Sequence, residues 1–135
     1  MPRFAERGRP LRLNLMLLIG FLAIGTAAGA DDSSIDVVVP ELSAAGLAGE
    51  AAFGEHCAAC HGSTAGGSGK GPPLVHPLYV SSHHGDMAFV LAVHQGARAH
   101  HWNFGDMPPV PDVTDEELAD LIVYVRELQH ANGLP

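Results

Sequence analysis

The stretch Cys57-Ala58-Ala59-Cys60-His61 decides how the rest of the chain is interpreted. It holds both cysteines of the sequence, and a histidine follows the second one directly. This C-x-x-C-H pattern is typical of covalent haem attachment. The spacing places the two sulfurs about one helical turn apart, where each can form a thioether with a haem vinyl group. His61 then lies next to the macrocycle and can offer its imidazole to the iron.

Two other interpretations of the same cysteines stay open. A C-x-x-C pair can be a redox dithiol, although no βαβ pattern surrounds it here. It can also be half of a zinc site, and no second cysteine pair completes one. A zinc site formed by Cys57, Cys60 and two histidines is still conceivable. The adjacent His61 favours haem over both alternatives.

The first 30 residues have the pattern of a secretion signal. Four of the seven basic residues precede residue 13, and residues 13–30 carry no charge. The uncharged run ends in Ala28-Gly29-Ala30, a small-x-small site. A basic start, an apolar run and such a site are typical of a cleaved signal peptide. The alternative is a retained membrane anchor over residues 13–30, which is barely long enough to span a bilayer. Either way we expect a bacterial protein that is periplasmic or otherwise exported.

Composition limits the function classes. The chain has 135 residues, of which 47% are hydrophobic and 16% charged, which favours one folded domain. After residue 30 it holds three basic and fourteen acidic residues, a formal charge of −11. A nucleic-acid-binding protein needs a basic surface, so we expect no nucleic-acid partner. The charge favours basic protein partners instead.

The remaining pattern predicts an all-α domain. Residues 35–39 form a short β-like run that we expect to lie against the domain as an extension. Helices are predicted over residues 47–59 and 86–95, the latter with Asp86 as N-cap and Gly96 as C-cap. Residues 62–73 and 97–113 are long glycine- and proline-rich loops. We therefore divide the chain into a signal (1–30), an extension (31–46) and one domain (47–135).

The last helix is the clearest. Thr114 and Glu117 form a predicted capping box at its start, and Asn132-Gly133 ends it. Between them runs an apolar stripe at helical spacing, made of Leu118, Leu121, Ile122, Val125 and Leu128. Three or more short helices with such long loops leave little protein core, so a bound group is expected to occupy the centre.

In order along the chain, these motifs make residues 47–131 resemble a small class I c-type cytochrome. Phe53 precedes Cys57 by four residues, as the packing aromatic of that family's first helix does. The stretch Gly71-Pro72-Pro73-Leu74 resembles the family's Gly-Pro-x-Leu loop. The resemblance implies one covalent haem c and a hydrogen bond from the His61 imidazole to the Pro72 carbonyl. It also implies that the last helix crosses the first at a glycine, for which Gly49 is the candidate.

The resemblance also implies the second iron ligand. Met107, in Gly105-Asp106-Met107-Pro108-Pro109, matches the family's distal methionine, which a proline follows. Met87 is expected to be a packing residue. Trp102, five residues before Met107, matches a tryptophan that donates its indole N–H to a haem propionate; a hydrophobic plug over the haem edge is the alternative.

The function implied is one-electron transfer between redox protein partners, without catalysis. A ligand-binding or sensing haem protein, in which Met107 does not hold the iron, is the alternative. The chain is also compatible with a subunit docked to a larger oxidoreductase.

Histidines depart from the family pattern. All nine lie after residue 30, and the pairs His83-His84 and His100-His101 flank the second predicted helix. Imidazoles suit copper and zinc, so these four residues are candidates for a second metal site, with Asp86 as a further candidate ligand. The alternatives are that a histidine displaces Met107, that the pairs gate partner docking by pH, or that they are ordinary surface residues.

Overall fold

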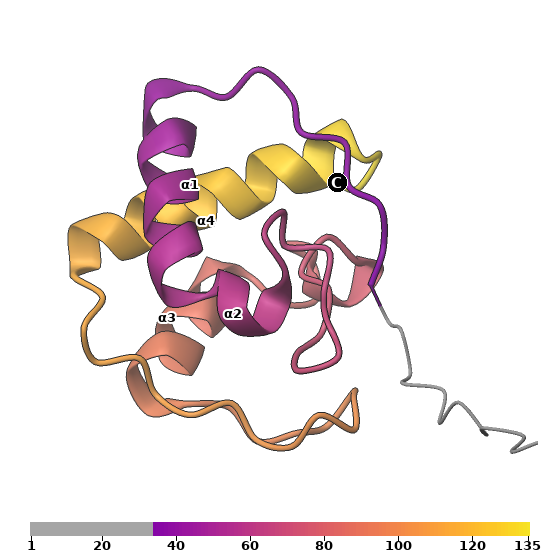
Figure 1. Ribbon diagram of the computed structural model, residues 1–135, viewed down its shortest axis with the longest axis vertical. Coiled ribbons are helices and arrows are strands. Elements are labelled where there is room, and N and C mark those ends of the chain that lie inside the picture. Colours follow the sequence, from indigo (N-terminus) through magenta and orange to yellow (C-terminus); the bar gives the residue numbers. More distant parts are fainter. Residues whose placement is uncertain (1–33) are drawn as a thin grey trace, which may run out of the picture.

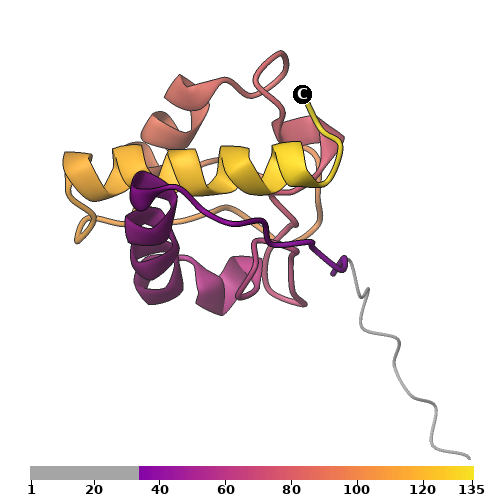
Figure 2. The same cartoon turned by 90° about the horizontal axis from the view of Figure 1, so that it is seen from above.

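The computed structural model describes residues 34–135, and the predicted signal lies outside the described residues (Figure 1). The elements in chain order are α1 (Ala44–His56), α2 (Ala58–His61), the 3-10 helix η1 (Pro77–Tyr79), α3 (Asp86–Gln95) and α4 (Asp115–Ala131). None of the described residues forms a strand, and none of these helices is long and apolar enough to cross a membrane. Figure 2 shows α4 with α1 and α2 on one side and α3 on the other.

The first helix begins earlier than predicted and breaks before the second cysteine. The Ser43 side chain caps α1 by accepting the Gly46 N–H at 3.0 Å. The predicted helix over 47–59 is interrupted at Cys57, whose φ of −122° is not helical. The chain resumes as the single turn α2, which ends at His61. The hydrophobic period missed both features, because it indicates which side of a helix is buried and not where the helix begins or breaks.

The bounds of α3 are those predicted, but its N-cap is not. Gly85 occupies the N-cap position, and Asp86 is the first helical residue. The Asp86 carboxylate accepts a hydrogen bond from Arg126 Nε at 3.0 Å instead of capping its own helix. Gly96 ends α3 as predicted, with a φ of +77° that favours glycine.

The capping box of α4 is confirmed. The Glu117 N–H donates to the Thr114 hydroxyl at 3.2 Å, and the Thr114 N–H donates to the Glu117 carboxylate at 2.9 Å. Residues 35–39 form no strand, but they do lie against the domain. The Ile35 N–H donates to the Gly66 carbonyl at 2.8 Å, and the Asn132 side chain bonds both backbone groups of Val38.

The crossing of α1 and α4 forms the core. A Cβ at Gly49 would lie 2.0 Å from the Asp120 carbonyl oxygen, so only glycine allows this approach, as the sequence predicted. Next to the crossing, the rings of Phe53 and Tyr124 pack with centroids 5.5 Å apart, and both residues are fully buried. This rigid crossing holds the start of α2, and therefore the cysteine pair, in a fixed place (Figure 1).

Candidate functional site

His61 ends α2 and is buried. Its Nδ1 lies 2.9 Å from the Pro72 carbonyl oxygen. A carbonyl only accepts, so Nδ1 carries the proton and Nε2 keeps its lone pair. Burial lowers the pKa of His61, and the bond to Pro72 partly opposes that shift. The ring is therefore neutral at physiological pH, in the form that ligates metals.

The two cysteines differ in their surroundings. Cys57 is buried and Cys60 is exposed, and neither forms a disulfide. Burial, and secondarily the neighbouring Cys60, raises the pKa of the Cys57 thiol to about 11. A redox dithiol needs a thiol with a lowered pKa, so this environment disfavours the dithiol interpretation.

A cavity of about 320 Å³ opens beside His61. Its wall is mostly apolar, with Leu74, Phe89, Val93 and Leu121 among the residues that line it. Most of the predicted site residues are on the same wall: Cys57, His61, Pro72, His84, His100, His101, Trp102 and Met107. Cys60 and His83 do not line it. Residues from α2, α3, α4 and both long loops therefore converge on one cavity.

Met107 is held on the cavity wall by its backbone. Its N–H and carbonyl form hydrogen bonds of 2.8 and 3.0 Å with the carbonyl and N–H of Ala97. A Cβ at Gly96 would lie 2.5 Å from the Met107 carbonyl oxygen, so this glycine also makes room for the loop. The expectation that Met87 packs in the core is wrong, because this residue is 65% exposed, and it does not line the cavity either.

Trp102 presents an unpaired donor. Its indole Nε1 is buried and has no hydrogen-bond partner, and its ring packs edge-on against His76 with centroids 5.2 Å apart. Burial raises the pKa of the nearby Tyr79 phenol, and the Trp102 side chain partly opposes that shift. The approach of the indole to the phenol does not have the geometry of a hydrogen bond, so Nε1 stays without an acceptor. A buried N–H without an acceptor is costly, so the site is suited to a ligand that brings one.

The histidine pairs are partly brought together. Ligand nitrogens of His83, His84 and His101 all lie within 4.8 Å of one another. The His100 ring packs against His101 at a tilt of 51°, with centroids 4.2 Å apart, but His100 is not in this group. Reduced hydration, followed by the neighbouring His100, His84 and His83, lowers the pKa of His101. The expectation for Asp86 is wrong, because its carboxylate pairs with Arg126 Nη2 at 2.9 Å.

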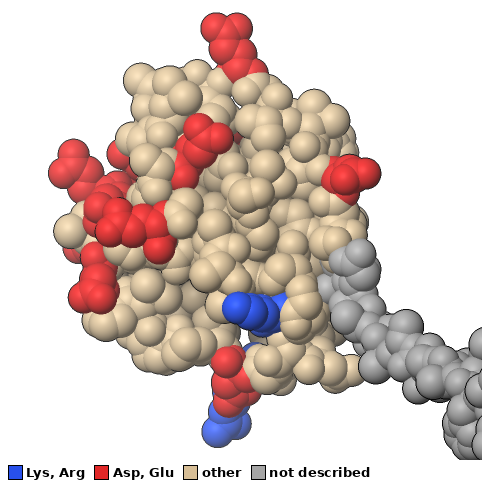
Figure 3. Space-filling view, viewed as in Figure 1, with Lys and Arg blue, Asp and Glu red and all other residues tan. Residues whose placement is uncertain are grey.

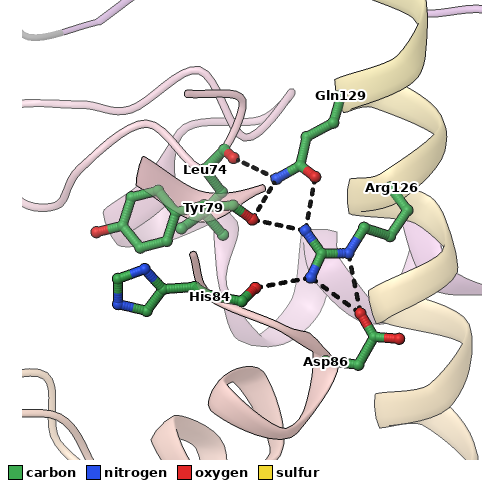
Figure 4. A network of polar contacts seen from close by, with 6 residues as sticks. All are labelled: Leu74, Tyr79, His84, Asp86, Arg126 and Gln129. Carbon is green, nitrogen blue, oxygen red and sulfur yellow. Dashed lines mark hydrogen bonds and ion pairs between the residues drawn. The ribbon is translucent and has the colours of Figure 1, made fainter. Parts of the chain in front are cut away.

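Sequence reasoning missed a polar network around Arg126 and Gln129 (Figure 4). The Arg126 guanidinium donates to the carbonyls of Tyr79 and His84 and to the Gln129 side chain. Gln129 is fully buried and donates to the carbonyls of Leu74 and Tyr79. The sequence feature that could have indicated this network is the presence of Arg126 and Gln129 on the otherwise apolar side of α4. The network ties residues 74–86, one side of the cavity, to that helix.

Comparison with known proteins identifies a family. The family model described as Cytochrome c matches residues 47–129. No curated protein and no solved structure matches the chain.

Proposed function

Because the chain belongs to the cytochrome c family, we propose that it carries single electrons between protein partners through one haem, with His61 and Met107 as axial ligands. The predicted resemblance and the predicted all-α cytochrome c fold are confirmed by the family match and the helical structure. The family and the C-x-x-C-H pair together indicate a covalently bound haem c. Membership also indicates an electron carrier rather than a catalytic enzyme.

The residues present suit a haem. The cavity is apolar, Cys57 lines it, and the buried Trp102 N–H lacks the acceptor that a propionate would supply. The observation that carries the axial assignment is the single hydrogen bond from His61 Nδ1 to the Pro72 carbonyl at 2.9 Å. It fixes the tautomer that leaves Nε2 free and raises its basicity as a ligand.

Each proposed group has a separate task. The haem supplies an iron that cycles between two oxidation states. His61 donates a neutral nitrogen, and Met107 donates a neutral thioether, which favours the ferrous state and raises the reduction potential. The apolar wall excludes water. With His61 and Met107 both on the iron, no position would be left for a substrate, as electron transfer without ligand binding requires.

An absorption spectrum of protein from a host that attaches haem c tests the axial ligands. We expect the weak long-wavelength band of a methionine sulfur on ferric iron, and no change when carbon monoxide is added to the reduced protein. Met107→Ala should abolish the band, open the iron to carbon monoxide and lower the potential. Met87→Ala, an exposed methionine outside the cavity, should leave all three properties unchanged.

Carbon monoxide binding to the unsubstituted protein would favour the ligand-binding or sensing alternative instead. A band that survives in Met107→Ala would show that another residue holds the iron.

The proposal extends to location and partners. The signal pattern of residues 1–30 supports export to the periplasm, either free or held by residues 13–30 as an anchor. The charge of −11 after residue 30 supports redox partners with a basic docking patch, and no nucleic acid.

A further inference from the structure

We propose that His83, His84 and His101 bind one tetrahedral divalent metal ion of the Zn²⁺ type at the wall of the haem cavity, in addition to the haem iron. Their ligand nitrogens lie within 4.8 Å of one another, although they come from two segments separated by α3. The proposal goes beyond electron transfer, and the geometry on which it rests involves neither His61 nor Met107.

The spacing of two nitrogens suits a tetrahedral ion. His83 Nε2 and His101 Nε2 lie 3.4 Å apart. In a tetrahedral site with zinc–nitrogen bonds of about 2.0–2.1 Å, two ligand nitrogens are about 3.3–3.4 Å apart. As a hydrogen bond, the same distance is long, because N–H donors prefer about 2.9–3.0 Å. The distance between these two nitrogens therefore fits two ligands of one metal ion better than it fits a hydrogen bond between the two rings.

His84 is oriented for the same task. Its Nδ1 lies against the Leu78 carbonyl oxygen, which only accepts, so Nδ1 carries the proton and Nε2 keeps its lone pair. A histidine ligand that donates its other nitrogen to a carbonyl is the usual outer arrangement of a metal site. Arg126 Nη2 also donates to the His84 carbonyl at 2.8 Å, which fixes the backbone of this ligand (Figure 4).

The two segments that carry the ligands are fixed before any ion arrives. The N–H groups of His83 and His84 both donate to the Val80 carbonyl, at 2.9 and 2.8 Å, in a tight turn. The loop with His101 is tied by the Ala99 N–H, which donates to the Asp106 carboxylate at 2.9 Å. Preorganised ligands lose less conformational freedom when an ion binds, and this favours affinity.

The three imidazole ligands favour a metal ion of intermediate softness. Three neutral imidazoles suit Zn²⁺ and Cu²⁺, whereas Ca²⁺ and Mg²⁺ prefer oxygen ligands. Three protein ligands leave the fourth position to water or to the neighbouring His100. His84 and His101 also line the cavity, so the bound cation would lie near the haem. A positive charge there disfavours ferric iron, so the reduction potential of the haem should rise when the ion binds.

Titration of the haem-loaded protein with zinc chloride, followed by calorimetry, tests the site. We expect one Zn²⁺ per chain in saturable binding. His83→Ala with His101→Ala should weaken that binding by about a hundredfold. The matched control, His56→Ala with His130→Ala, removes two histidines outside the cluster and should leave it unchanged. Both rings removed in the test variant are exposed, and equal thermal midpoints would confirm that the fold is kept.

Three outcomes would overturn the proposal. The haem-loaded protein could fail to bind Zn²⁺ saturably, which would leave the histidines as surface groups or propionate partners. The double variant at 83 and 101 could bind Zn²⁺ as tightly as the original. The same variant could change the methionine–iron band without zinc, which would place these histidines at the haem instead. Electron transfer is tested separately by the Met107 spectrum, so failure of one proposal is distinguishable from failure of the other.

Discussion

A single proton on His61 determines which of its nitrogens can reach a metal. The Pro72 carbonyl holds that proton at Nδ1, and burial keeps the ring from accepting a second one. The acceptor is a main-chain oxygen, so no neighbouring side chain supplies it. Prolines at positions 72 and 73 restrict the backbone around that oxygen. The imidazole is thus oriented by loop geometry rather than by a side-chain partner.

Gln129 is the buried amide on which the loop over residues 74–79 depends. Gln129→Leu keeps the volume but removes the Nε2 donor from the carbonyls of Leu74 and Tyr79. Only Tyr79 keeps a donor, from Arg126. We expect a loss of about 3 kcal/mol in the free energy of unfolding, measured with urea on the haem-loaded protein. Gln95→Leu, at an exposed site, should change it by less than about 0.5 kcal/mol; equal losses in both variants would refute the assignment.

Functional residues that lie close together in the sequence were predictable, and those that lie far apart were not. The pair Cys57 and Cys60 with His61 was predictable because the pattern occupies five consecutive residues. Gln129 bonds to Tyr79 and Leu74, which precede it by 50 and 55 positions in the sequence. No local periodicity in the sequence predicts contacts over such a separation. The gathering of His83, His84 and His101 was only half predictable. The adjacency of His83 and His84 was visible in the sequence, whereas the loop closure that brings His101 to them was not.

Two of the three glycines in helix α1, Gly49 and Gly54, have opposite surroundings, and they offer a matched pair. A Cβ at Gly49 would lie 2.0 Å from the Asp120 carbonyl oxygen of α4, whereas a Cβ at Gly54 would meet nothing within 4 Å. Gly49→Ala must push the two helices apart, so we expect a loss of about 3 kcal/mol in the free energy of unfolding. Gly54→Ala should gain about 0.5–1 kcal/mol from helix propensity. Urea midpoints measure both; two equal gains would mean that the helices do not cross at Gly49.

The start of α4 should make stability depend on pH. Hydrogen bonds from the Thr114 backbone N–H, and then from its hydroxyl, hold the pKa of Glu117 below its usual 4.5. The unfolded chain therefore takes up this proton at higher pH than the folded chain. The stabilisation is present above about pH 4.5 and is lost as the pH falls through the folded-state pKa.

Glu117→Gln isolates that charge, because glutamine can keep the capping box. At pH 7 the variant should be less stable than the original, and the difference should shrink as the pH falls below 4.5. Urea unfolding at a series of pH values measures it. Glu116→Gln removes a charge from the same first turn but leaves the capping box intact, so it measures the contribution of the helix dipole alone. A difference that is constant with pH would rule out the carboxylate as its source.

Helix ends were predictable where a side chain or a glycine marks them. Thr114, Gly96 and Asn132 gave correct ends because each satisfies backbone groups locally. The break at Cys57 carries no such mark, since its residues are ordinary helix formers on both sides. Its cause is the chain's turn toward the cavity, which is a tertiary effect.

The whole molecule has an uneven charge distribution. Figure 3 shows acidic side chains gathered on the side where α4 begins, and few basic ones on the same face. The first turn of α4 alone contributes Asp115, Glu116 and Glu117. Acidic groups there also interact favourably with the N-terminal end of the helix dipole. The field they produce extends beyond any contact surface and acts before a partner docks.

Electron exchange with a basic redox protein should therefore weaken with salt. We expect the second-order rate to fall about tenfold between about 0.01 M and about 0.15 M ionic strength, as the Debye length shortens from about 30 Å to about 8 Å. Stopped-flow reduction measures that rate. A neutral small-molecule reductant serves as the control, and its rate should not change. A protein–protein rate that is independent of salt would show that charge does not steer the encounter.

The two hydrogen bonds between Ala97 and Met107 form the neck of a closed loop. The neck, rather than the length of residues 98–106, fixes where Met107 lies. Insertions or deletions inside the loop would leave the methionine in register while they changed what the loop displays. His101 and Trp102 belong to the part that the loop displays, so such changes would alter what lines the cavity. The chain thus separates the position of Met107 from the composition of the loop, so the loop could change at the cavity wall while the methionine kept its place.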